Sequence, residues 1–143
     1  MISSQAPDIT FLYCIAAATV LVYLPFLVVA YERVRVGFDI AAPRTMFDKL
    51  PPYAQRATWA HQNSFEALII FAPAALMAYV TGVNSSVAHG SAIAFVVVRL
   101  LYSIFYIGNI PVARSLMFAI GNLCSGILIV LSILQANGSS LLP

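Results

Sequence analysis

Four long apolar stretches dominate the sequence and limit the folds that are open to it. They cover residues 9–31, 59–80, 87–107 and 116–136, and the first and last contain no charged side chain. About 20 mostly apolar residues are enough to cross a bilayer as a helix. Backbone in lipid must satisfy its own hydrogen bonds, which a helix does within one segment. The 143 residues therefore predict an all-α membrane protein, a single domain formed by a four-transmembrane-helix bundle.

The composition supports this prediction and excludes other classes. Hydrophobic residues make up 62% of the chain and charged residues only 8%, whereas a soluble domain is about a quarter charged. The same numbers exclude a disordered chain, a coiled coil and a nucleic-acid-binding protein. The expected surroundings are membrane lipids, and the function must be sought in the few polar residues.

The positive charges predict the orientation in the membrane. The segment between the first two stretches holds five Lys or Arg residues, of which Arg56 lies just before the second stretch, and Arg114 lies between the third and the fourth. The two tails and the turn at residues 82–86 hold none. Under the positive-inside rule, loops one and three are cytoplasmic and both termini lie outside.

Polar side chains in the second stretch form a ladder along one face. At helical periodicity, Arg56, Asn63 and Glu66 fall within an arc of about 80°, joined by Gln55, Trp59 and Gln62. A charged side chain in a membrane helix costs about 2.5–3.5 kcal/mol on insertion scales, so such residues need a reason.

The third stretch repeats this pattern with Arg99, Tyr102 and Tyr106, and Arg114 and Ser115 open the fourth at the same level. One interpretation is structural, with Glu66 paired to an arginine and the other polar groups bonding helices together. However, the cations outnumber the lone carboxylate. Guanidinium groups bind carboxylates well, so the set also fits a site for an anionic ligand.

The histidines and small residues suggest packing. Neither His61 nor His89 has a second ligand three or four residues away, so we expect no metal site. His61 points away from the ladder and is interpreted as an interfacial or packing residue, and His89 is expected to face solvent. Small residues at 121, 122, 125 and 126 allow close helix approach. Because four helices do not easily enclose a polar pocket, we expect an oligomer.

The order and spacing of these residues resemble the MAPEG family, the membrane-associated proteins of eicosanoid and glutathione metabolism. The similarity covers about residues 40–140. It rests on R-A-x-x-A-H-x-N-x-x-E-x-x-x-x-F from Arg56 to Phe71, R-L-L-Y-x-x-x-Y from Arg99 to Tyr106, and A-R-S at residues 113–115. Pro43-Arg44 is similar to the bacterial branch of the family.

The resemblance implies a homotrimer in a bacterial inner membrane that binds glutathione as co-substrate near the cytoplasmic face. It implies a glutathione-dependent transferase or peroxidase that acts on lipophilic electrophiles without a metal. Arg114 would stabilise the glutathione thiolate as the catalytic residue, helped by Ser115. The tripeptide would be bound by Arg56, Asn63, Glu66, Tyr102 and Tyr106.

The resemblance leaves several points open. An arginine at the end of the first span also belongs to the family site, and Arg33 and Arg35 both qualify. Trp59 stands where the eukaryotic members have an arginine, four residues before the asparagine. The alternatives are a non-catalytic lipid- or anion-binding scaffold, or a small proton-coupled transporter that uses Glu66. The arginines near Glu66 disfavour a site for cationic drugs.

Overall fold

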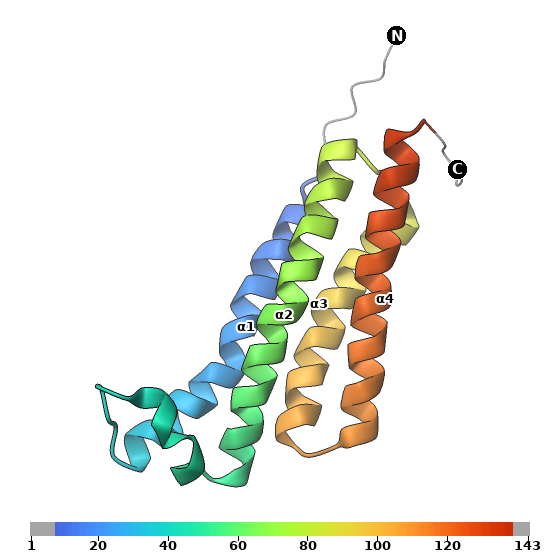
Figure 1. The fold of residues 1–143 in the computed structure, drawn as a ribbon. Helices are drawn as coiled ribbons and strands as arrows, with labels where there is room; N and C mark the ends of the chain where they lie inside the picture. The colour runs from blue at the N-terminus through green and yellow to red at the C-terminus, as the bar shows by residue number, and fades with distance from the viewer. Residues whose placement is uncertain (1–7, 139–143) are drawn as a thin grey trace.

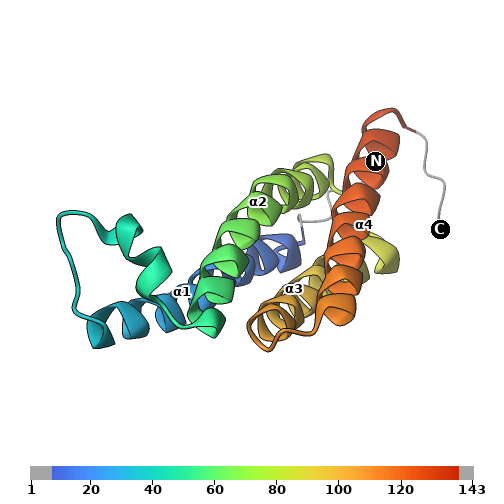
Figure 2. The same cartoon turned by 60° about the horizontal axis from the view of Figure 1, so that its bottom comes forward.

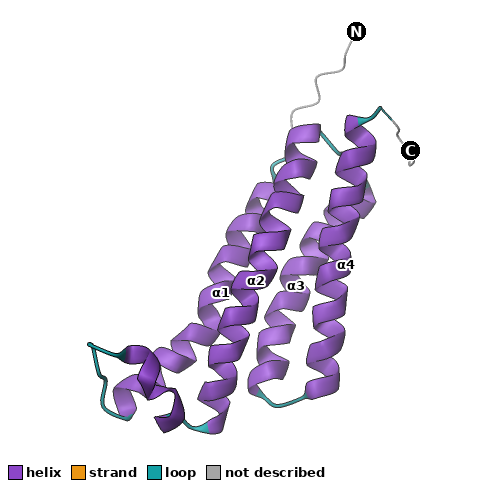
Figure 3. Cartoon of the chain, viewed as in Figure 1, coloured by secondary structure: helices purple, strands orange, loops and turns teal. Residues whose placement is uncertain are grey.

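The computed structural model describes residues 8–138, and these form a bundle of four long helices with one short 3₁₀ helix (Figures 1 and 3). No described residue lies in a strand. The elements are α1 (Thr10–Arg35), η1 (Pro43–Lys49), α2 (Pro52–Thr81), α3 (Ser86–Ile107) and α4 (Pro111–Ala136). All four α-helices are long and apolar enough to cross a membrane. The predicted all-α four-helix membrane fold is confirmed. The terminal tails, expected outside the cell, lie outside the described residues.

The connections place the basic segments together. Figure 1 shows η1 and the α3–α4 turn at one end of the bundle and the α2–α3 turn at the other. The α2–α3 turn forms because Gly82 adopts a left-handed φ of 69°, which glycine adopts without strain. Ser85 then caps α3 by accepting a hydrogen bond from the Ala88 N–H at 3.2 Å. The expected antiparallel hairpin is therefore present.

The buried face of α2 consists mostly of alanine, and this decides how closely its neighbours pack. Its buried residues recur every three or four positions: Ala54, Ala57, Ala60, Ser64, Ala67, Phe71, Ala74, Ala75 and Ala78. Small side chains let neighbouring helices approach closely in a membrane. α2 packs against all three other helices, and α1 also contacts α3, as the end view of the bundle in Figure 2 shows. Phe71 stacks on Phe95 of α3 with ring centroids 3.7 Å apart, which fixes the α2–α3 pair in the core.

The expected packing role of His61 is confirmed. Its Nδ1–H donates to the Val22 carbonyl of α1 at 2.7 Å, one turn before Pro25. Proline weakens the helical hydrogen bonds in that turn, and a neighbouring side chain can replace them. The His61 ring also lies 5.1 Å from the rings of Phe26 and Phe65. This contact joins α1 to α2 beside the bend in α1.

The expectation that His89 faces solvent is wrong. His89 is half-buried, its ring stacks on Phe11 at 5.1 Å, and its Nε2 lies 2.9 Å from Asp8 Oδ2. Hydrogen bonds from the Thr10 hydroxyl and N–H hold the pKa of the Asp8 carboxyl below its ordinary value. The start of α1 covers the start of α3, and no sequence pattern indicated that contact.

Candidate functional site

Arg99 lies at the centre of the polar residues that α2, α3 and α4 bring together. Its side chain is only 4% exposed. Its Nη2 donates to Asn63 Oδ1 and to Ser64 Oγ, both at 3.2 Å. Its guanidinium group also lies over the Tyr102 ring, 4.1 Å from the centroid. Arg99 was expected in the polar set that fits an anionic ligand, but not among the residues assigned to glutathione. The available signal was an arginine deep in an apolar span.

Asn63 connects this arginine to the carboxylate of Glu66. Its Nδ2 donates to Glu66 Oε2 at 3.2 Å while its Oδ1 accepts from Arg99. Glu66 itself is exposed. Neither of the two ion pairs found within residues 8–138 involves Glu66 or Arg99. The interpretation of Glu66 as the direct partner of an arginine therefore does not hold in the described protomer.

Tyr102 and Tyr106 connect the polar residues around Arg99 to Arg114 of α4. The Tyr102 and Tyr106 rings meet edge to face at 5.5 Å, and the Arg114 guanidinium lies 4.3 Å from the Tyr106 ring centroid. Cations over phenol rings gain electrostatic stabilisation without being neutralised. We refer to Asn63, Arg99, Tyr102, Tyr106 and Arg114 as the arginine–tyrosine cluster. The structure thus brings together five residues that the sequence placed on three separate helices.

Arg56 lies outside this cluster. Its Nε donates to the carbonyl of Ile107 at 3.0 Å, and Ile107 is the last residue of α3. The last carbonyls of a helix lack intrahelical partners, and a cation there is favourable. No hydrogen bond or ion pair among the described residues joins Arg56 to the cluster. Its contact ties the start of α2 to the end of α3.

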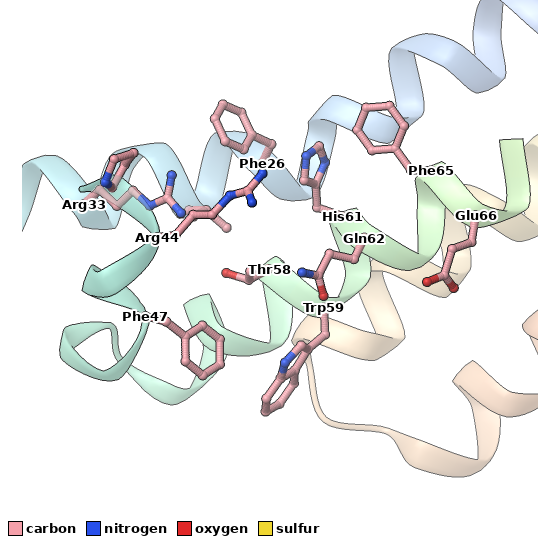
Figure 4. A pocket seen from close by; sticks show the side chains of 12 residues that line it. Phe26, Arg33, Arg44, Phe47, Thr58, Trp59, His61, Gln62, Phe65 and Glu66 are labelled. Atoms are coloured by element: carbon pink, nitrogen blue, oxygen red, sulfur yellow. The ribbon is translucent and has the colours of Figure 1, made fainter. Parts of the chain in front are cut away.

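A cavity of about 950 Å³ lies on the other side of α2 (Figure 4). Its walls are the end of α1, η1, and α2 from Thr58 to Glu66. Trp59 lines it and contacts Phe47 of η1, with ring centroids 5.5 Å apart. Glu66 lines the cavity and is also bonded to Asn63, so the cavity and the arginine–tyrosine cluster meet at this residue.

The structure distinguishes the two arginines at the end of α1. Arg35 Nη1 donates to Glu32 Oε1 at 3.0 Å, and this buried carboxylate also accepts from the Tyr53 hydroxyl. Arg33 instead lines the cavity, and its buried Nε has no hydrogen-bond partner within residues 8–138. Of the two arginines, Arg33 is the one that lines the cavity. Sequence reasoning missed Glu32, although its spacing of three from Arg35 is typical of a helical ion pair.

The site is rich in cations, and its polar groups suit an anionic ligand. Within the described part of the chain, no three His, Cys, Asp or Glu side chains are grouped as metal ligands. The polar groups instead supply guanidinium donors, phenol hydroxyls, an amide and one exposed carboxylate.

The sequence model of the MAPEG family matches residues 10–134. This range contains all of α1, α2 and α3 and most of α4, and with them the cluster and the cavity. No curated protein and no solved structure matches the chain.

Proposed function

The chain belongs to the MAPEG family of membrane proteins, which includes glutathione-dependent enzymes, and on this basis we propose that it is a glutathione-dependent transferase or peroxidase acting on lipophilic electrophiles. One observation supports this most. Arg99 and Arg114 each stack on a phenol ring, and neither is in an ion pair within the described residues. Cations left without a counter-ion beside hydroxyl groups suit a bound thiolate and its carboxylates.

The proposed chemistry needs only thiolate stabilisation and proximity. A cation near the glutathione sulfur lowers the pKa of the thiol and makes it nucleophilic at neutral pH. In a transferase turnover, the thiolate forms a carbon–sulfur bond and the leaving group departs with the bonding electron pair. In a peroxidase turnover, the thiolate attacks a peroxide oxygen, the O–O bond breaks, and the alcohol leaves after protonation. A second glutathione thiol then displaces the sulfenic oxygen as water and forms glutathione disulfide. Arg114 is the proposed catalytic residue. Ser115 follows it directly on α4, and its hydroxyl group is proposed to help stabilise the thiolate.

The tripeptide would be held by the residues around Glu66. The exposed Glu66 carboxylate suits the α-ammonium group, and Asn63 holds that carboxylate in position. Tyr102 and Tyr106 would line the site. Arg56 was also expected to bind the ligand, but its Nε is engaged by the Ile107 carbonyl, which leaves only its terminal nitrogens for this role.

We further propose a homotrimer in a bacterial inner membrane, with both termini outside and loops one and three cytoplasmic. The exposed positions of Trp59 and Glu66 on the single protomer support a neighbouring copy at this flank. A second copy would bring its own Arg114 and tyrosines to the cavity and close the site. An electrophile dissolved in the bilayer could then enter between the helices.

The test is glutathione binding to the detergent-purified protein, followed as thiolate absorbance near 240 nm. We expect a saturable thiolate signal in the parent and its loss in Arg114→Ala. Lys49→Gln is the control, because Lys49 is an exposed cation in loop one away from the cluster. A full thiolate signal in Arg114→Ala would contradict the assigned role, and no binding at millimolar glutathione would contradict the function.

A further inference from the structure

The cavity between α1, η1 and α2 has opposite charges at its two ends. Arg33 of α1 and Arg44 of η1 line one end, and Glu66 of α2 lines the other. Figure 4 shows both guanidinium groups on the α1–η1 side and the Glu66 side chain at the opposite end, with Trp59 and Gln62 between them.

The two arginines have no counter-ion in the described protomer. Neither ion pair found within residues 8–138 includes Arg33 or Arg44. Arg33 also keeps a buried Nε without a hydrogen-bond partner there. Two like charges lining one cavity repel each other, and a buried donor without an acceptor is costly. A bound carboxylate between them would remove both penalties.

The length of the cavity matches an extended tripeptide. It follows α2 from Thr58 to Glu66, and eight residues of helix rise about 12 Å. Three extended residues span about 10 Å. Aromatic rings of Phe26, Phe47, Trp59 and Phe65 line the walls, so a carboxylate held there is partly shielded from water and its contacts to the arginines are strengthened.

From this arrangement we infer that Arg44, presented by η1 together with Arg33, binds the glycine carboxylate of glutathione while Glu66 binds the α-ammonium group at the other end. The inference rests on the proposed function and adds the orientation of the ligand. It also gives loop one a role in specificity.

The test compares glutathione with its glycine monoethyl ester, which lacks the negative charge at that end. We expect the parent to bind glutathione about tenfold more tightly than the ester, as for a charge-assisted contact of ordinary strength. Arg44→Gln should show a clearly smaller preference for glutathione, because only Arg33 remains to bind the carboxylate. Lys49→Gln, which removes an equal charge from the same 3₁₀ helix, should keep the parental preference. Arg44 is exposed on a short helix, so the variant is expected to fold.

Two further readouts fix the orientation and separate this inference from the proposed function. A glutathione analogue without the α-amino group should lose affinity equally for the parent and Arg44→Gln, because that end lies at Glu66. The thiolate absorbance at saturation should be the same in both proteins, because Arg114 is intact. Equal binding of acid and ester by the parent, or an unchanged preference in Arg44→Gln, would overturn the inference even if a thiolate forms. No glutathione binding by the parent would overturn the proposed function and the inference with it.

Discussion

Replacing Asn63 tests whether its amide links the buried arginine to the exposed carboxylate. In Asn63→Ala, Arg99 keeps Ser64 as an acceptor but loses the Asn63 Oδ1 contact at 3.2 Å. A hydrogen bond to a charged group contributes about 1.5–3 kcal/mol. Asn63 is half-buried and water can replace part of the contact, so we expect the lower end, about 1.5 kcal/mol. The thermal midpoint in detergent should fall by about 5 °C.

Asn63→Asp separates the contact of residue 63 with Arg99 from its contact with Glu66. The new carboxylate forms a full ion pair with Arg99, but its second oxygen replaces the N–H that now donates to Glu66 at 3.2 Å. Like charges at that distance repel, so Glu66 should be displaced. We expect stability equal to or above the parent and weaker glutathione binding, measured on the same sample by thermal unfolding and by thiolate absorbance.

Asn122→Ala is the matched control, because Asn122 is an exposed asparagine on α4. It should not lower the midpoint. A loss of stability in Asn63→Asp as large as that in Asn63→Ala, or an Asn63→Ala midpoint equal to that of Asn122→Ala, would refute the proposed link.

Three further substitutions test contacts that hold the helices together, each followed by thermal unfolding in detergent. Tyr53→Phe removes a donor to the buried Glu32 carboxylate, so the midpoint should fall. His61→Ala removes the donor to the Val22 carbonyl at 2.7 Å and should cost about 1–3 kcal/mol, as expected when a buried acceptor loses its partner. Gly121→Ala should raise stability by about 0.5–1 kcal/mol because alanine is the better helix former, and an added Cβ would meet neighbouring side chains only at 3.6–3.8 Å.

Each of these has a result that would contradict it. Tyr31→Phe is the control for Tyr53, since Tyr31 is exposed on α1, and equal losses in both would contradict the Glu32 contact. Gly126→Ala adds a Cβ with no heavy atom within 4 Å. A gain there with a loss in Gly121→Ala would mean that α3 and α4 pack more tightly than the structure indicates. Parental stability of His61→Ala would contradict the bond across the α1 bend.

The sequence was sufficient to predict the spans, the bundle and the two polar stripes. An apolar stretch of this length forms a helix in lipid because a helix satisfies all of its own backbone hydrogen bonds. Hydropathy therefore determines the fold class. Helical periodicity then places Asn63 with Glu66 on one helix and Arg99 with Tyr102 and Tyr106 on another, and the structure joins these stripes through the Arg99–Asn63 contact. The family resemblance was likewise readable from the spacing of these residues, and the family match confirms it.

The partners across helices could be decided only by the tertiary structure. Arg33 and Arg35 differ by two positions, yet one lines the cavity and the other is paired with Glu32. Helical periodicity places Arg56 on the same face as Asn63. In the structure, however, its side chain donates a hydrogen bond to the Ile107 carbonyl, because the end of α3 has an unsatisfied acceptor there. Periodicity is local and is encoded in the order of residues. Which face meets which neighbour depends on helix rotation, on the small-residue surface of α2 and on the course of η1, and these arise only when the four helices pack together.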